Sequence, residues 1–495
     1  MTSLASSLRV VPLPRLHVRT LLVIVALGCV FVLNVFGFTD PDFWWHLRTG
    51  QYIVETQSIP HTDLFSYTAF GKPWITHEWL SQILMYLLYD SMGYWANVVF
   101  FAAIVTLTFF LLFRLVVKLG VNEVVAICLV FWSALIMRPF FTVRPLTFTW
   151  LLFVVFLSLL YSYHRGQARH LWLLPLLMVL WINLHGGFFI GLLLIGLLIA
   201  TRLAERWLLH KEAEVRHLMV VFGLSLLASL ANPNGLLGLA YPISYMGMGN
   251  PSARLIIEWQ SPDFHNYYWL LFLVPLFVTM ALGLVNRSLG LWPLLLTIVL
   301  ATMGFQSLRH IPLYALAAAP ILGETLRSRY SSVASSQRPA QSISMHSLNW
   351  LLLASLLAAA VILAWKLPYS QMRQTPLLSR GFSYPEEGAE YVRDHYPNAR
   401  LFNEYGWGGY LIYTLYPNQK VFIDGRADVY GESLMNQHSE VVQLKPNWRE
   451  VLEQYGVDLL LIEKDSRLSV LLDAAEGWEK VFSGSVEDVF VKGNI

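Results

Sequence analysis

Residues 21–50 read LLVIVALGCVFVLNVFGFTDPDFWWHLRTG, an apolar run followed at once by two aspartates, two tryptophans, a histidine and an arginine. The run from about Leu21 to Phe38 is long enough to cross a membrane, because a spanning helix needs about 20 mainly apolar residues. It follows a basic start and has no small-residue cleavage site, so we expect a retained first span and not a signal peptide. The polar residues after it would then lie at a membrane surface.

The composition of the whole chain indicates a membrane protein. Of its 495 residues, 56% are hydrophobic and 13% are charged, whereas soluble domains carry about 25% charged residues. The net charge of +2 gives no reason to expect nucleic acid as a partner. The two cysteines, Cys29 and Cys128, lie inside apolar runs, which argues against a disulfide framework or a cysteine metal site.

Recurring apolar runs predict a polytopic α-helical membrane protein with about 11 transmembrane helices. Residues 171–201 would form a helix of about 46 Å, too long for a bilayer core of about 30 Å, so we expect a hairpin broken at Gly186-Gly187. We interpret residues 78–92 as an amphipathic helix on the outer surface. The expected spans lie near 20–38, 95–113, 121–137, 147–164, 169–184, 188–207, 217–231, 268–285, 290–304, 311–326 and 348–365.

The distribution of lysine and arginine predicts the orientation. With a cytoplasmic N-terminus, most basic residues fall in inner loops, as the positive-inside rule requires. We therefore expect a multi-pass protein of the cytoplasmic (inner) membrane, with residues 328–346 as a cytoplasmic linker and the C-terminal part outside. The inner basic residues are Arg114, Lys118, Arg165, Arg169, Arg202, Arg206, Lys211, Arg216, Arg287, Arg327, Arg329 and Arg338.

Two domains are expected. Residues 1–366 would form the transmembrane domain, with a first extracytoplasmic loop at about 39–94, and residues 367–495 would form an extracytoplasmic α/β domain. In the second domain the stretches SYPEEGAEYVRDHY and WREVLEQYG predict helices, whereas KVFID and VDLLLIE predict strands.

With this topology the unusual polar residues gather on the outer face. Ionisable groups at membrane depth are costly and suggest function, although several have simpler interpretations. An arginine at a span end can extend to the headgroups, His185 can cap a turn, and Trp44 and Trp45 can belong to an interfacial aromatic belt or stack on sugars. The outer candidates are Asp40, Asp42, Trp44, Trp45, His46, Arg138, Arg144, His185, Glu258, Arg309 and His310.

The Asp40-Pro41-Asp42 stretch is the strongest of these signals. Proline stops the helix and holds two carboxylates close together at the membrane surface. Beside His46 they suit metal coordination or general-base catalysis, because burial and neighbouring charge tune their pKa values. We favour Asp42 as the functional carboxylate and expect Asp40 to cap the following turn.

Several strings in this chain resemble those of a broad bacterial group of membrane proteins similar to the GT-C superfamily of glycosyltransferases. They are DPDFWWHLRTG, IPHTDLFSYT, GKPWITHEWL, WINLHGGF, RHIPLYALAAAP and YGWGGYLIYTLYPNQKVFIDGRADVYG. The resemblance covers nearly the whole chain. It implies a cell-envelope enzyme that takes a sugar, hexosyl or pentosyl, from a polyprenyl-phosphate-linked donor and transfers it to a glycan, lipid or protein acceptor at the outer face.

By this resemblance, Asp42 or Asp40 takes the position of the first-loop catalytic carboxylate. The leaving lipid phosphate would be neutralised by Arg138, Arg144 or Arg309, which we expect to converge around one cavity. A divalent cation, Mg or Mn, could share this role. Its expected ligands are Asp42, His46 and Glu258, and second-rank candidates in the same loop are Asp63, His77 and Glu78.

Other functions remain open from the sequence. A glycan polymerase or ligase would share the outer arginines, a lipid-linked glycan transporter would need polar groups along a path through the membrane, and a non-catalytic scaffold would not need the acidic pair. In the C-terminal domain, Asp424, Arg426 and Asp428 have two interpretations of equal weight. They bind the acceptor, or they form a structural Asp–Arg pair that holds the domain on the membrane part.

Overall fold

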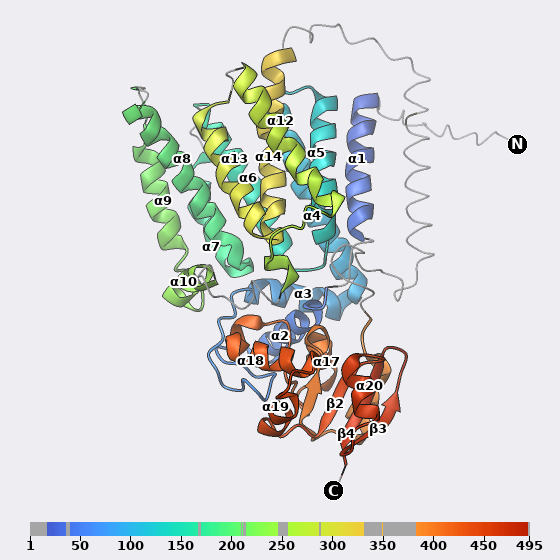
Figure 1. Ribbon diagram of the computed structural model, residues 1–495. Coiled ribbons are helices and arrows are strands. Elements are labelled where there is room, and N and C mark those ends of the chain that lie inside the picture. Colours follow the sequence, from blue (N-terminus) through green and yellow to red (C-terminus); the bar gives the residue numbers. More distant parts are fainter. Residues whose placement is uncertain are drawn as a thin grey trace, which may run out of the picture.

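The computed structural model has two layers, a helical bundle and a smaller α/β domain, with the first loop between them (Figure 1). It describes residues 17–35, 40–166, 170–208, 210, 214–245, 256–286, 289–330, 349 and 383–493. The span expected at 348–365 and most of the linker expected at 328–346 lie outside the described residues.

Long apolar helices form the bundle. Six are long and apolar enough to cross a membrane among the residues described, and three more, α7, α9 and α13, are apolar but shorter. The protein is therefore a multi-pass membrane protein. The bundle helices are α1 (Val18–Val35), α4 (Tyr94–Lys118), α5 (Glu123–Met137), α6 (Leu146–His164), α7 (Leu173–Leu184), α8 (Phe189–Leu208), α9 (Arg216–Ala228), α12 (Leu270–Asn286), α13 (Leu291–Gln306) and α14 (Ile311–Tyr330).

The break expected at Gly186-Gly187 is confirmed. Helix α7 ends at Leu184, a short 3₁₀ turn η3 (Gly186–Phe188) follows, and α8 then begins at Phe189. Both glycines are needed for close packing, because a Cβ on Gly187 would overlap Thr149 and one on Gly186 would press on His77. The turn therefore sits tightly against two other parts of the chain.

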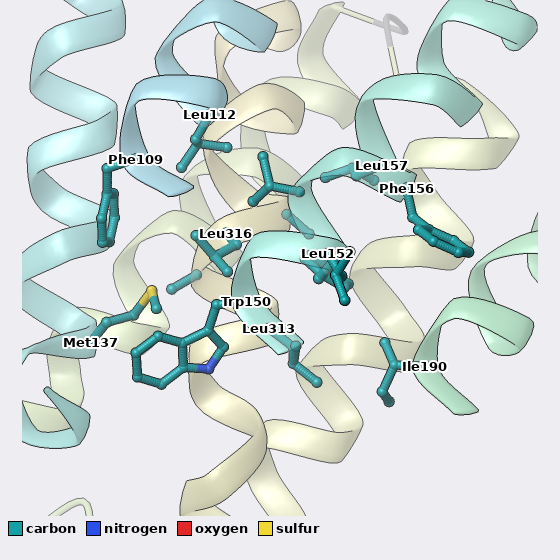
Figure 2. Packing of buried hydrophobic residues seen from close by; sticks show 14 of the residues in the cluster. Phe109, Leu112, Met137, Trp150, Leu152, Phe156, Leu157, Ile190, Leu313 and Leu316 are labelled. Atoms are coloured by element: carbon teal, nitrogen blue, oxygen red, sulfur yellow. The ribbon is translucent and has the colours of Figure 1, made fainter. Parts of the chain in front are cut away.

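Helices α6 and α14 run through the centre of the bundle. Side chains from α4, α5, α6, α8 and α14 interdigitate there, among them Trp150 and Leu313 (Figure 2). Trp150, Phe156 and Leu316 are almost completely buried. Because lipid also surrounds the bundle with apolar groups, close packing of this kind is what distinguishes helix–helix contact from helix–lipid contact.

The connecting loops gather at two opposite ends of the bundle. At one end Arg165 pairs with Glu324 at 2.5 Å and Arg202 donates to the carbonyl of His164. At the other end lie the first loop and the α/β domain (Figure 1). The described basic loops are therefore segregated from the polar residues of the expected outer face, and the assignment of these ends to cytoplasm and exterior stays a prediction.

The first loop lies across the ends of the bundle helices. It contains α2 (Phe43–Thr56) and α3 (Trp79–Met92), which pack on each other. Helix α3 lies across the base of the bundle (Figure 1), and it is not among the described helices that are long and apolar enough to cross a membrane. The interpretation of residues 78–92 as a surface helix agrees with this arrangement, and its position on the outer surface of a membrane stays a prediction.

Short elements complete this end of the bundle. The turn η1 (Arg138–Phe140) precedes α6, and α10 (Gly235–Tyr245) follows α9. The turns η4 (Ile257–Trp259) and η5 (Tyr267–Trp269) precede α12, and η6 (Leu308–His310) joins α13 to α14.

The α/β domain contains a sheet of four strands in the order β1-β2-β4-β3, with β1 parallel to β2 and the other pairs antiparallel. The helices expected in SYPEEGAEYVRDHY and WREVLEQYG and the strand expected in VDLLLIE are confirmed. The elements are α16 (Glu386–His395), β1 (Leu401–Asn403), η8 (Tyr405–Trp407), α17 (Gly408–Leu415), α18 (Ala427–Val442), α19 (Trp448–Gln454), β2 (Leu459–Glu463), α20 (Arg467–Asp473), β3 (Trp478–Ser483) and β4 (Glu487–Lys492).

The prediction of a strand in KVFID is wrong. Val421 instead forms an isolated parallel bridge with Ser66 of the first loop. Its backbone donates to the carbonyl of Phe65 and accepts from the amide of Tyr67, both at 3.1 Å. The segment has strand-like residues because it pairs with another part of the chain and not with the domain's own sheet. This pairing joins the α/β domain to the first loop.

Candidate active site

A single cavity lies where the bundle, the first loop and the α/β domain meet. Its volume is about 160 Å³. The bundle supplies apolar walls, the first loop supplies acidic, histidine and tryptophan side chains, and the α/β domain supplies three residues. The lining residues are Asp42, Trp45, His46, Trp74, His77, Glu78, Arg144, Leu146, Thr149, Trp150, His185, Gly186, Gly187, Phe189, Ile190, Tyr241, Pro242, Trp259, Arg309, His310, Leu313, Gly425, Arg426 and Asp428.

The guanidinium of Arg144 binds three carboxylates, and we call this group the cavity cluster. Its Nη2 lies 2.7 Å from Asp42 Oδ2, its Nη1 lies 2.8 Å from Glu258 Oε1, and its Nε lies 3.2 Å from Asp40 Oδ2. These residues come from the loop after α1, the loop before α6 and the turn η4. One positive charge thus faces three negative groups, so the cluster carries excess negative charge when all are ionised.

Charge and burial move the pKa values of this cluster in different directions. Burial raises the pKa of Asp42 to about 7, and the carboxylate of Asp40 adds to the increase while Arg144 opposes it. Burial likewise raises the pKa of Asp40. For Glu258 burial is outweighed by Arg144 and Arg309, which together lower its pKa. Of the three carboxylates of the cavity cluster, Asp42 is therefore the one that lines the cavity and has a pKa raised to about 7.

The structure separates the two aspartates as expected. Asp40 is 4% exposed, does not line the cavity, and accepts the backbone N–H of Asp42 at its Oδ1 with a distance of 3.0 Å. Asp42 lines the cavity, and its Oδ1 accepts from Trp45 Nε1 at 3.0 Å. Asp40 thus orders the turn, and Asp42 is held between an indole N–H and Arg144.

The three outer arginines do not all converge. Arg144 and Arg309 line the cavity, but Arg138 does not. Arg138 is the first residue of η1, directly after α5, whereas Arg144 lies two residues before α6. The expectation that all three arginines converge is therefore wrong for Arg138.

Arg309 is the available cation of the cavity. Its guanidinium lies 5.0 Å from the ring centre of Trp259, and within the described residues it forms no ion pair of 4 Å or less. Arg144, in contrast, is saturated by three carboxylates. His310, the next residue, also lines the cavity. An anionic group entering the cavity would find an uncommitted positive charge at Arg309.

The expected metal ligands do not converge on one point. Asp42 and Glu258 both bind Arg144, so a guanidinium occupies the position between them that a divalent cation would take. His46 turns away and places its Nδ1 3.6 Å from Glu78 Oε2. In the described part of the chain no group of three or more acidic, cysteine or histidine residues is arranged to hold a metal ion. This ligand set does not fit Mg or Mn.

The two tryptophans of the first loop have different environments. Trp45 lines the cavity and its ring lies 3.7 Å from that of His46. Trp44 does not line the cavity. It packs edge-on against Tyr384 and Tyr410, with ring centres at 6.0 Å and 5.5 Å. Trp44 therefore contributes to the contact between the first loop and the α/β domain, and Trp45 alone is placed to touch a substrate.

Glu78 is surrounded by three histidines. His185 Nε2, His46 Nδ1 and His77 Nε2 lie 3.3 Å, 3.6 Å and 3.7 Å from its carboxylate. The Nδ1 of His185 accepts the N–H of Gly187 at 2.8 Å, so the proton of the neutral ring is on Nε2, facing Glu78. Burial raises the pKa of Glu78 to about 7, against the effect of Arg309 and Arg144.

A second arginine, Arg426, joins the α/β domain to the first loop, and we call this group the latch. Its Nη1 lies 2.8 Å from Asp63 and its Nη2 2.6 Å from Asp424. The guanidinium also stacks on Phe65 and Trp74, at 5.0 Å and 4.6 Å from the ring centres. The structural interpretation of the Asp–Arg pair therefore fits Asp424 and Arg426, although Arg426 also borders the cavity that Asp428 lines.

Several lining residues were not expected from the sequence. Trp74 and Gly425 lie within strings that carry the resemblance, but neither has an ionisable side chain to single it out. Thr149 is inside a span, where it accepts from Trp181 Nε1 at 3.0 Å. Tyr241 lies in α10, and no local pattern distinguishes it from an interfacial tyrosine.

Gly425 brings the α/β domain into contact with the acidic motif. A Cβ at this position would overlap Asp42 Oδ1 and approach the indole nitrogen of Trp45. A Cβ at Gly409 would likewise press on the carbonyl of Pro41. The domain thus touches the Asp40-Pro41-Asp42 turn through positions that have no side chain.

The chain resembles known proteins in its fold and not in its sequence. No family model and no curated protein sequence matches the chain. Two cryo-EM structures of the arabinofuranosyltransferase AftD from Mycobacteria are similar to 95% and 96% of the chain, with TM-scores of 0.52 and 0.51 and identities of 13% and 14%. The chain shares the fold of the part of AftD that it matches.

The chain spans only 41% and 40% of the length of those two proteins. ArnT from Cupriavidus metallidurans, solved bound to undecaprenyl phosphate, is similar over 95% of this chain and 97% of its own, at 13% identity and a TM-score of 0.48. A TM-score below 0.5 carries no argument about the fold. The shared fold is therefore that of AftD.

Proposed function

We propose that this protein is a glycosyltransferase that moves a sugar from a polyprenyl-phosphate-linked donor to a hydroxyl group of an acceptor, at the outer face of the cytoplasmic membrane. The observation that carries the proposal is the composition of the cavity. An uncommitted arginine, Arg309, and a carboxylate that titrates near neutral pH, Asp42, share one cavity with apolar side chains of the bundle. In a lipid-linked sugar phosphate, the phosphate would face Arg309, the lipid would face the apolar side chains, and the sugar would lie near Asp42.

The apolar wall suits the lipid part of such a donor. Leu146, Ile190 and Leu313 come from α6, α8 and α14 and line the cavity. Because a prenyl chain in the bilayer already has apolar surroundings, close packing against such side chains, and not removal from water, would hold it there. The phosphate would then lie at the level of η6, which carries Arg309.

The proposed reaction is one displacement at the anomeric carbon. The acceptor oxygen forms a bond to this carbon as the bond between the carbon and the phosphate oxygen breaks, and the electron pair leaves with the phosphate. Asp42 takes the proton of the acceptor hydroxyl, because a base with a pKa near the working pH is the most effective one. Arg309 stabilises the charge that develops on the leaving phosphate.

The cavity cluster sets the properties of Asp42. Arg144 and Trp45 each hold one carboxylate oxygen, so the side chain cannot rotate freely. Each oxygen keeps a lone pair for the incoming proton. Asp40 contributes negative charge that keeps Asp42 basic. No step is assigned to a metal ion, because the expected ligand set is occupied by Arg144.

The test uses the full chain in lipid nanodiscs with a panel of polyprenyl-phosphate-linked pentoses and hexoses and a cell-envelope extract as acceptor. Mass spectrometry would measure the release of polyprenyl phosphate. We expect at least one donor to be consumed by the unaltered protein and not by Asp42→Asn. Consumption by both proteins at the same rate, or consumption of no donor, would contradict the proposal.

A further inference from the structure

A second polar region of the same cavity contains His77, Tyr241 and Asp428, which we call the acceptor cluster. We infer that this cluster binds the hydroxyl groups of a sugar-bearing acceptor, so that the α/β domain supplies part of the acceptor site. The inference rests on the proposed function and names the chemical class of its second substrate. None of the three residues has a role in the reaction step described above.

The cluster is assembled from three separate parts of the chain. His77 belongs to the first loop, Tyr241 to α10 and Asp428 to the first turn of α18. The ring of Tyr241 stacks on that of His77 with centres 4.3 Å apart, and its hydroxyl donates to Asp428 Oδ2 at 3.2 Å. Tyr241 therefore connects a residue of the membrane part with one of the α/β domain, and all three line the cavity.

The side chains of His77 and Asp428 can accept further hydrogen bonds from a ligand. His77 Nδ1 lies 3.1 Å from the carbonyl of Ile75, which can only accept, so Nδ1 carries the proton and Nε2 of the neutral ring has a lone pair. Nε2 is 3.7 Å from Glu78 Oε1, beyond hydrogen-bonding distance. Asp428 offers carboxylate lone pairs beyond the one that the Tyr241 hydroxyl uses. Hydroxyl groups of a ligand can donate hydrogen bonds to His77 Nε2 and to the Asp428 carboxylate.

The charge of the cluster excludes the phosphate of the donor. Burial lowers the pKa of His77, so the ring is neutral at neutral pH, and Asp428 can only be neutral or negative. The arginine that acts on Asp428, Arg426, has a side chain that is 1% exposed and is paired with Asp63 and Asp424. An anion would therefore bind at Arg309, and an uncharged polyhydroxylated group is the better ligand for the acceptor cluster.

Aromatic side chains beside the cluster suit a sugar ring. Trp45, Trp74 and Trp259 line the same cavity as Tyr241. The C–H faces of a sugar pack on such rings, and its hydroxyl groups point outward to polar partners. The cavity thus combines apolar faces and hydrogen-bond acceptors in the way that recognition of a carbohydrate requires.

The test measures two ligands on the same full-length protein in nanodiscs. A panel of methyl glycosides, with pyranose and furanose rings, serves as the acceptor probe in saturation-transfer NMR titrations, and undecaprenyl phosphate serves as the donor-side probe. The variants are Asp428→Asn and His77→Phe, which keeps a ring to stack on Tyr241. Asp465→Asn is the matched control, because Asp465 is exposed in the same domain and its φ of 58° suits asparagine.

We expect at least one glycoside to bind the unaltered protein and to bind Asp428→Asn and His77→Phe about tenfold more weakly, the effect of losing one hydrogen bond to a buried acceptor. Undecaprenyl phosphate should bind all variants equally. Equal glycoside affinity in the variants, or no glycoside binding alongside normal lipid binding, would overturn the inference and leave the proposed function intact. Failure of the unaltered protein to bind the lipid would overturn the proposed function itself. Thermal unfolding of each variant shows whether it is folded. If Asp428→Asn or His77→Phe does not fold, Tyr241→Phe, which removes only one hydroxyl, is tested in its place.

Discussion

The cavity cluster and the latch are built from the same kinds of residue and have opposite properties. In the cavity cluster, the side chains of Arg144, Asp42 and Glu258 are 15%, 16% and 28% exposed. In the latch, those of Arg426, Asp63 and Asp424 are 1%, 0% and 0% exposed. One arginine faces three carboxylates in the first and two in the second.

The difference shows how the surroundings leave one motif accessible from the cavity and bury the other in a contact between domains. The faces of Phe65 and Trp74 cover the latch, and its arginine is paired with two buried carboxylates, although Arg426 borders the cavity. The cavity cluster has an additional carboxylate and an open side, and Asp42 is left with a raised pKa and access to the cavity.

The largest effect is expected from Asp42→Asn. The change keeps the shape and removes the base, so transfer should fall by about 100- to 10,000-fold, whereas the melting temperature should stay near that of the unaltered protein. Release of polyprenyl phosphate measures the rate. Asp465→Asn should have no effect. If Asp40→Asn were inactive and Asp42→Asn fully active, the roles of the two aspartates would be reversed.

Breaking the latch should affect stability more than chemistry. Arg426→Gln leaves Asp63 and Asp424 buried without their cation, which costs about 3–5 kcal/mol for a buried pair that loses one partner. Limited proteolysis of the α/β domain and thermal unfolding measure this loss. Arg449→Gln, at an exposed position of the same domain, is the control. Unchanged protease resistance in Arg426→Gln would show that the latch does not hold the domain.

Gly425 links the two clusters, because it lies next to Arg426 and touches Asp42. Gly425→Ala should push Asp42 away from Arg144 and lower transfer by about 100-fold, the effect of a misplacement of about 1 Å. The control is Gly28→Ala, since a Cβ at Gly28 meets no atom within 4 Å. Normal transfer by Gly425→Ala would mean that the domain does not position the carboxylate.

Arg309, which forms no ion pair among the described residues, is expected to bind the phosphate, whereas Arg144 is already paired with carboxylates. Arg309→Gln should weaken binding of undecaprenyl phosphate by about 10- to 100-fold, because one charge-assisted hydrogen bond contributes about 1.5–3 kcal/mol. Arg114→Gln, at an exposed position on the opposite end of the bundle, should bind the lipid normally. Equal affinity in both variants would remove the phosphate role from Arg309.

The smallest effect is the dependence on pH. Since the base must be deprotonated and burial raises the pKa of Asp42 to about 7, kcat/KM should rise about tenfold per pH unit below that value and level off above it. Burial also raises the pKa of Glu78 to about 7, so the profile is compared with that of Glu78→Gln. A profile that is flat from about pH 5 to about pH 8 would contradict the assignment of Asp42.

Much of the architecture could be predicted from local pattern. The apolar runs, the break at Gly186-Gly187, the surface position of α3 and the preference for Asp42 over Asp40 each follow from a few adjacent residues. Hydrophobic length, glycine and proline decide these features, and all of them are visible in the sequence.

The pairings between distant residues could not be predicted in this way. Arg144 and Asp42 are 102 positions apart, and nothing in either segment distinguishes Arg144 from Arg138. The segment KVFID has the composition of a strand but pairs with the first loop. In both cases the partner is chosen by how the domains dock, which local periodicity does not encode.

The central claim is that this cavity binds a lipid-linked phosphate at Arg309 beside Asp42. A cryo-EM structure of the full chain in nanodiscs with undecaprenyl phosphate tests it most directly. We predict density for the phosphate within hydrogen-bonding distance of Arg309, with the prenyl chain along Leu146, Ile190 and Leu313. A lipid phosphate bound only at the opposite end of the bundle, near Arg114 and Lys118, with none in the cavity, would contradict the account.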